Sequence, residues 1–127
     1  MTSTRNPVGW FEIHVADMQR AKAFYEAVFQ RPLFALATGD ESYTMQVFAG
    51  DVQNAGAAGA LVQHSMRQPT TEGVMVYFSS EDCAVESQRA IDHGGCIFKP
   101  KRSIGNNGFI AIIGDTEGNA IGLHSIK

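Results

Sequence analysis

The sequence lacks the features that mark several large classes of protein. No apolar run approaches the roughly 18 residues of a membrane-spanning helix, and residues 1 to 7 are polar, without an apolar signal core. Cys83 and Cys96 are the two cysteines, and neither belongs to a CxxC or a Cys/His zinc pattern, so we expect two free thiols. The lack of a leader, a membrane span and paired cysteines predicts a cytoplasmic protein with no membrane partner.

An excess of basic charge is also missing. The chain has 10 Lys and Arg against 13 Asp and Glu, a net charge of −3, which offers no basic surface for nucleic acid or for an anionic membrane. Its 127 residues are 44% hydrophobic and 18% charged, which is enough to close one hydrophobic core. We therefore expect a single globular domain over residues 1–127 that does not bind nucleic acid.

Residues 9 to 29 have the pattern of a strand followed by a helix. Residues 9 to 15 alternate, so that one face carries Phe11, Ile13 and Val15 and the other carries Trp10, Glu12 and His14. Asp17 is a good N-cap, and apolar residues then recur at helical spacing until Pro32 stops the helix. With short β-like runs at residues 33 to 37, 43 to 49 and 59 to 63, this stretch predicts a β-α-β-β-β module over about residues 8–64.

The same unit returns after a shift of 65 residues. Residues 74 to 80 form a second alternating run, and Asp82 caps a second helix that ends near His93. Further β-like runs lie at residues 96 to 99, 108 to 113 and 120 to 126. Because an internal repeat indicates the architecture, we predict a linker over about residues 65–72 and a second module over about residues 73–127.

Each module has one helix, which can cover only one face of its sheet. We therefore predict an α+β fold in which two β-α-β-β-β modules form a strongly curved mixed sheet with the helices on the convex side. The other set of alternating residues would line the concave face, where a small molecule would bind. The predicted ligand-binding residues are Trp10, Glu12, His14, Met75, Tyr77, Gly122 and His124.

Two segments carry a resemblance to a known family. They are the pattern Ile13-x-Val15-x-Asp17 leading into Ala23-Phe24-Tyr25, and the run DTEGNAI at residues 115 to 121. Together with the internal repeat and the chain length, they resemble the vicinal oxygen chelate superfamily of glyoxalases, bleomycin-resistance proteins and extradiol dioxygenases. The stretches GWFEI, GALV, NGFIA and GLHS are similar to a glyoxalase-like subgroup. The resemblance implies a homodimer.

The resemblance also implies where a metal would bind. Metal enzymes of the superfamily use His and Glu ligands on the first and last strands of each module, and those positions correspond here to Trp10, Met75, Gly122 and about Ala60. None of these side chains suits a hard or borderline divalent cation. A glycine at position 122, on the same face as His124, would leave space where such an enzyme has its ligand. We therefore predict no metal and no other cofactor.

Several functions remain open at this point. We expect a metal-independent protein that binds a small apolar or aromatic molecule, with Trp10, Met75 and Tyr77 in contact with it. The alternative is a lyase, isomerase or dioxygenase-type enzyme. Such an enzyme could bind a divalent metal at a shifted site made of Glu12, His14 and His124. It could instead use Glu12 and His14 as candidate catalytic acid and base, in which case Glu12 would be partly buried beside Trp10. A third possibility is a dimerisation module with a vestigial cleft.

Three further segments receive structural interpretations. We expect His64 to begin an exposed polar loop between the modules and His93 to lie at a helix C-terminus. Residues 101 to 108, KRSIGNNG, are predicted to form a loop of the second module.

Overall fold

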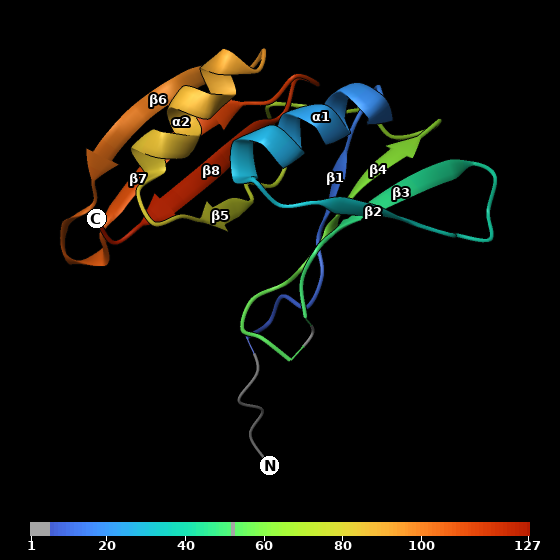
Figure 1. The fold of residues 1–127 in the computed structure, drawn as a ribbon, viewed down its shortest axis with the longest axis horizontal. Coiled ribbons are helices and arrows are strands. Elements are labelled where there is room, and N and C mark those ends of the chain that lie inside the picture. The colour runs from blue at the N-terminus through green and yellow to red at the C-terminus, as the bar shows by residue number, and fades with distance from the viewer. Residues whose placement is uncertain (1–5, 52) are drawn as a thin grey trace.

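The structure is a computed structural model that describes residues 6–51 and 53–127. Residues 1–5, part of the segment expected to lack a signal core, lie outside the described residues, as does residue 52. Figure 1 shows two groups of strands with both helices on the same side of the molecule. The elements follow in the order β1 (Glu12–His14), α1 (Met18–Phe29), β2 (Leu33–Leu36), β3 (Tyr43–Phe48), β4 (Ala60–His64), β5 (Tyr77–Ser79), α2 (Cys83–Asp92), β6 (Cys96–Ser103), the 3₁₀ turn η1 (Gly105–Asn107), β7 (Phe109–Gly114) and β8 (Ala120–Ser125).

The two halves of the chain repeat one topology, as the shift of 65 residues predicts. The first sheet has the strand order β1-β4-β3-β2 and the second has the order β5-β8-β7-β6. In each sheet the first and last strands of the module are parallel neighbours, with Glu12 opposite Ala60 and Tyr77 opposite Gly122. Asp17 and Asp82 cap the two helices through their side chains. The α+β fold class and the two-module architecture are confirmed.

The two modules share one hydrophobic core. Phe78 of β5 contacts Phe48 of β3 and Phe11 before β1, with ring centroids 5.7 and 5.8 Å away. The two helices also meet, because the Arg89 guanidinium donates a hydrogen bond to the Val28 carbonyl at 3.2 Å. The core-facing side of each sheet is therefore the side that carries the helices.

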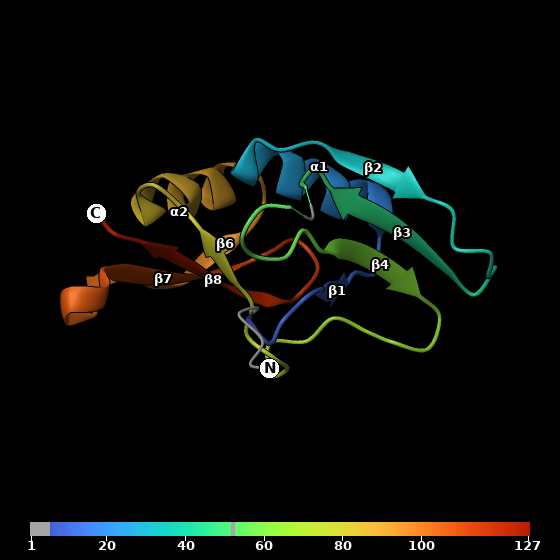
Figure 2. The ribbon, with the colours of Figure 1, turned by 90° about the horizontal axis from the view of Figure 1, so that it is seen from below.

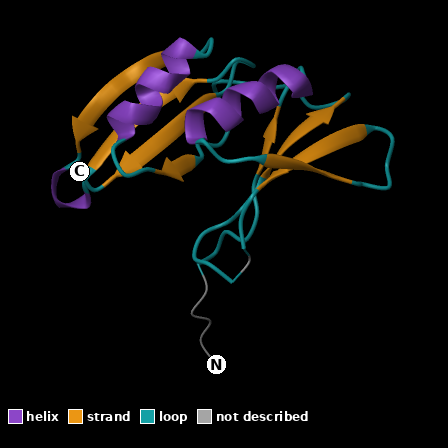
Figure 3. Cartoon of the chain, in the orientation of Figure 1, coloured by secondary structure: helices purple, strands orange, loops and turns teal. Residues whose placement is uncertain are grey.

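This packing differs in one respect from the single curved sheet expected from the sequence. The strands form two separate hydrogen-bonded sheets, and Figures 2 and 3 show these sheets set at an angle with the helices on one side. The opposite, helix-free face of each sheet points away from the shared core.

Some strand boundaries differ from the predicted ones. The alternation over residues 9 to 15 and 74 to 80 gives only three-residue strands, β1 and β5, each at an edge of its sheet. Strand β6 is longer than predicted and includes Lys101 to Ser103, so only the remainder of the predicted loop is non-strand. His64 is the last residue of β4 rather than the start of a loop.

Other expectations are met in detail. Cys83 is buried and Cys96 is exposed, and both are free. His93 is the C-cap of α2, where its Nδ1 lies 2.9 Å from the Arg89 carbonyl oxygen. Over residues 6–51 and 53–127, no helix is both long enough and apolar enough to cross a membrane.

Candidate functional site

The helix-free face of the first sheet carries the three polar and aromatic residues predicted around β1. Ile13 and Val15 are buried in the core, so Trp10, Glu12 and His14 point to the opposite face. Trp10 is 43% exposed, and its Nε1 donates a hydrogen bond to Glu12 Oε2 at 3.2 Å. The predicted orientation of this strand therefore agrees with the structure.

His14 is a half-buried imidazole in a positively charged setting. Burial lowers its pKa below the ordinary value of 6.5, and the nearby Arg67 and His64 lower it further. Glu12 acts in the opposite direction and raises it. The net lowering favours the neutral imidazole at neutral pH, so His14 is available there as a hydrogen-bond donor and acceptor.

His64 belongs to the same face, which the sequence analysis did not recognise. His14 pairs with Val62 across the parallel ladder, so His64 lies two residues further along β4 with the same orientation. The ring of Tyr43 stacks on His64, with centroids 5.6 Å apart and an interplanar angle of 20°. The Met66 amide donates to His64 Nδ1 at 2.9 Å, so the neutral ring carries its proton on Nε2. The alternation of Ala60, Val62 and His64 is the sequence signal that would have extended this strand to His64.

The helix-free face of the second sheet is built around Tyr77 and Gly122. These two residues are direct partners in the β5–β8 ladder. A Cβ atom on Gly122 would overlap Cδ1 and Cε1 of the Tyr77 ring, so this ring lies directly on the glycine backbone. The space expected at Gly122 is filled by an aromatic ring that is itself exposed on its outer side. Glycine is needed at this position because the ring approaches the strand so closely.

Met75 and His124 flank this pair in different ways. Met75 precedes β5 and is 38% exposed, as suits a residue at an open apolar surface. His124 is half-buried, and its Nε2 lies 2.6 Å from the Asn107 carbonyl oxygen. A carbonyl oxygen only accepts, so Nε2 donates this hydrogen bond. His124 therefore anchors the η1 turn to β8.

The structure does not bring the two predicted groups of residues together into one cleft. Trp10, Glu12 and His14 lie on the outer face of one sheet, and Tyr77, Gly122 and His124 lie on the outer face of the other. Both faces point away from the core in which Phe78 meets Phe48. Within one chain, each face is an open wall rather than one side of a closed pocket.

The residues present do not fit the metal site that the resemblance implies. Trp10, Met75 and Ala60 offer no suitable donor atom, and the Tyr77 ring covers the backbone of Gly122. The alternative set of Glu12, His14 and His124 is split between two sheets, and Nε2 of His124 already donates to Asn107. Among the residues that the structure describes, no three His, Cys, Asp or Glu side chains are grouped as a metal ion would require.

Glu12 also differs from the partly buried acid considered in the sequence analysis. It is solvent-exposed, and its carboxylate accepts from Trp10. The proximity of Glu12 to His14 is retained, because the carboxylate acts on the imidazole electrostatically. The two residues form an exposed polar pair beside an indole.

Comparison with known proteins gives the family. The profile of the Glyoxalase/Bleomycin resistance protein/Dioxygenase superfamily matches residues 8–123. A sequence comparison with curated proteins finds no match.

Solved structures of similar fold have low sequence identity to the chain. Glyoxalase I from Zea mays is 19% identical with a TM-score of 0.71, over 99% of this chain and 48% of that one. This chain therefore spans about half the length of glyoxalase I. A glyoxylase/bleomycin resistance protein/dioxygenase domain from Frankia sp. EAN1pec is 14% identical with a TM-score of 0.72, over 96% of this chain and 98% of that one.

A third structure is TnmS3, an antibiotic binding protein from Streptomyces sp. CB03234. It is 22% identical with a TM-score of 0.65, over 98% of each chain. At these identities the likeness concerns the fold, whereas the family profile covers most of the sequence. The chain belongs to the glyoxalase/bleomycin resistance protein/dioxygenase superfamily.

Proposed function

We propose that this protein binds a small, partly aromatic molecule on the helix-free faces of its sheets, without a metal ion. The observation that carries the proposal is that each module has a large exposed aromatic residue at or just before its first strand. Trp10 is 43% exposed and Tyr77 is 48% exposed, and each lies beside hydrogen-bonding groups. Large exposed rings of this kind offer stacking surfaces for a planar ligand.

Polar groups beside Trp10 would orient the ligand. His14 can donate or accept as a neutral imidazole, and Glu12 and Arg67 supply charges of opposite sign nearby. Such a combination suits a ligand with an aromatic body and one or two polar substituents. The fold likeness to an antibiotic binding protein is compatible with this mode of action.

A homodimer would complete the site. Each helix-free face continues into exposed apolar side chains: Phe34 and Leu36 on β2 are 59% and 51% exposed, and Phe98 on β6 is 51% exposed. A second copy would cover this apolar surface. The helix-free face of the first sheet in one copy would then lie opposite the helix-free face of the second sheet in the other copy. The open walls would then become two sides of a cleft. We place this dimer in the cell interior as part of the same proposal.

A metal-free enzyme is the second candidate, because Glu12 perturbs His14 electrostatically beside the proposed ligand surface. The pair could transfer a proton in an isomerase or lyase reaction. Glu12 is solvent-exposed, however, and its carboxylate accepts a hydrogen bond from the Trp10 indole. Binding without turnover is therefore the function that we favour.

The proposal predicts that binding and dimerisation fail together. Light scattering should find a dimer for the wild type and for Val85→Ser, a control at a 43% exposed apolar residue on α2. Phe34→Ser should give a monomer and should weaken binding of planar aromatic probes in calorimetry by at least about tenfold. A monomeric wild type that binds the same probes would contradict the dimer. A dimer that binds no probe, or converts a bound probe to product, would contradict the binding function.

A further inference from the structure

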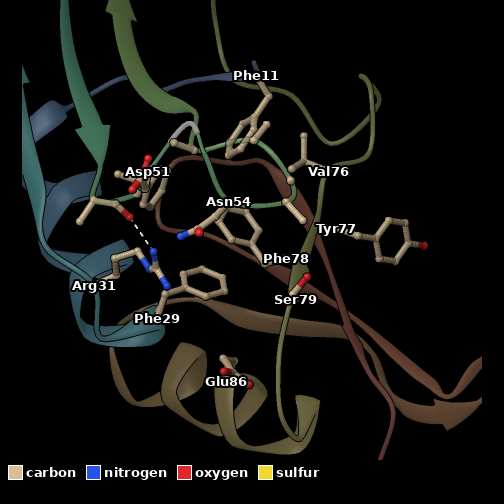
Figure 4. Close-up of a pocket in the computed structure, with 17 residues that line it drawn as sticks. Phe11, Phe29, Arg31, Asp51, Asn54, Val76, Tyr77, Phe78, Ser79 and Glu86 are labelled. Carbon is tan, nitrogen blue, oxygen red and sulfur yellow. Dashed lines mark hydrogen bonds between the residues drawn. The ribbon is translucent and has the colours of Figure 1, made fainter. Parts of the chain in front are cut away.

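A cavity lies at the junction of the two modules, on the core-facing side of the sheets. It has a volume of about 410 Å³ and opens between the end of α1, the loop after β3 and strand β5. Figure 4 shows the ring of Tyr77 pointing away from this cavity while Phe78 points into it. The cavity is therefore distinct from the helix-free face to which Tyr77 belongs. Its volume falls within the range of pockets that hold small molecules.

Aromatic rings form the floor of this cavity. Phe29 of α1 and Phe78 of β5 stack with centroids 4.2 Å apart at an interplanar angle of 22°. Phe11 meets Phe78 edge-on at 5.8 Å and 81°. All three rings are only half-buried, because part of their surface lines the cavity. These rings present both apolar contact area and the negative π-faces that attract cations.

The polar rim of the cavity has an excess of negative charge. Asp51, Glu86 and Arg31 are its charged residues. The Arg31 guanidinium donates to the Ala49 carbonyl at 2.6 Å and so holds the loop after β3. Figure 4 places Asp51 on the same side of the cavity as Arg31 and Glu86 on the far side. Arg31 therefore lies at the Asp51 end of the cavity, and Glu86 is the charged residue that lines the other end.

Glu86 has no basic ion-pair partner among the described residues. The ion pairs there are Arg20–Glu117 and Lys101–Asp82. Glu86 lies in the first turn of α2, where the helix dipole favours a carboxylate. It accepts one hydrogen bond from the Ser80 hydroxyl through Oε1. Its position beside the cavity rim leaves this half-buried carboxylate accessible to a cationic ligand.

We propose that this cavity binds a small monocationic organic amine. The apolar body of the amine would lie against Phe29 and Phe78, and its ammonium group would lie at the Glu86 carboxylate. An organic anion would meet Glu86 without compensation, and a neutral molecule would gain only the apolar contacts. The site is separate from the ligand surface around Trp10 and does not depend on the function proposed there.

Three ligands with the same ring test the charge preference of the cavity. Benzylamine, benzyl alcohol and benzoate are titrated into the wild-type protein at neutral pH and followed by amide NMR shifts around Ser79 and by calorimetry. Benzylammonium should bind saturably, and benzyl alcohol should bind about tenfold more weakly. Benzoate should not bind. Equal binding of all three, or no binding of benzylamine, would overturn the proposal.

Variants then locate the site. Glu86→Gln keeps an acceptor for Ser80 and should weaken benzylamine binding about tenfold, whereas Glu81→Gln, an exposed control next to the same helix, should leave it unchanged. Phe29→Leu should weaken binding as well, with thermal unfolding used to verify that each variant is folded. Trp10→Ala should retain the amine affinity. If Trp10→Ala alone abolishes amine binding, the amine binds on the helix-free face and this inference is wrong.

Discussion

Arg20 and Glu117 join the two modules through an ion pair with 2.6 Å between Nε and Oε2. The same Glu117 carboxylate also accepts hydrogen bonds from the backbone amides of Ala16 and Asp17, at 2.9 and 2.8 Å. These are free amides at the start of α1, so a residue of the second module caps the helix of the first. The Glu117 side chain is fully buried, whereas that of Arg20 is 51% exposed.

Removing Glu117 should therefore cost much more stability than removing Arg20. We expect Glu117→Ala to lower the free energy of unfolding by about 2–4 kcal/mol, because it removes a buried carboxylate that holds two partly buried amides and a cation. Arg20→Ala should cost only about 0.5–1 kcal/mol, because its side chain is half in solvent. Urea unfolding of the two variants measures both values. Equal losses would show that the helix amides do not depend on Glu117.

The same carboxylate should make the fold sensitive to acid. Burial raises the pKa of Glu117, but hydrogen bonds from Arg20, Asp17, Thr116 and Ala16 outweigh it, and the pKa lies below its ordinary value of 4.5. A lowered pKa in the folded state stabilises the fold above pH 4.5, and this stabilisation is lost as the pH falls through the folded value. Wild type should lose more stability between pH 5.5 and 3 (roughly the range over which Glu titrates) than Glu117→Gln does. Parallel pH profiles would contradict the assignment.

The packing of Tyr77 on Gly122 gives a test of the second sheet. Gly122→Ala should cost about 1 kcal/mol, because the new Cβ must displace the ring. In a Tyr77→Ala background the same substitution should cost almost nothing, since the overlapping ring is gone. A double-mutant cycle of thermal or urea unfolding measures this coupling. Additive effects of the two substitutions would mean that the ring does not lie on the glycine.

His14 offers a direct measurement of the charges on the first sheet. Its pKa, followed by NMR, should lie below 6.5, should rise in Arg67→Gln and should fall further in Glu12→Gln. A lowered histidine pKa means that the fold loses stability as the pH falls below 6.5, since protonation costs more in the folded state. His93→Gln serves as the control, because His93 lies at the far end of α2. A His14 pKa that neither variant shifts would show that Arg67 and Glu12 do not act on this imidazole.

Much of the fold follows from local patterns in the sequence. Alternation around Ile13 identifies the core-facing side of β1, and Asp17 and Asp82 mark both helix starts because a cap is a local interaction. The shift of 65 residues places Glu12 and Tyr77 at corresponding positions, and the two ladders agree, because Glu12 pairs with Ala60 and Tyr77 pairs with Gly122. These features depend on neighbours within a few residues or on the repeat itself.

The relative placement of the modules could not be predicted in the same way. It depends on contacts over about 100 residues, such as Glu117 with the α1 amides and Tyr25 with Asp115, whose side chains are 2.7 Å apart. The alternation of apolar and polar residues shows which residues share a face of a strand, but it does not show how the two sheets are oriented. The sequence alone therefore predicts Trp10 and Tyr77 in one cleft, whereas they lie on different sheets. The cavity beside Phe29 and Glu86 was also missed, because it forms where α1, α2 and two loops meet.

The most direct test of the proposed function uses the fluorescence of Trp10, the single tryptophan of the chain. The protein is titrated with planar bicyclic probes such as quinoline, naphthol and coumarin, in a chelator and then with an added divalent metal. We predict a saturable change in Trp10 emission in the chelator, weakened in His14→Ala and unaffected by the metal. Emission that no probe alters, or that changes only when the metal is present, would contradict a metal-free ligand surface at Trp10.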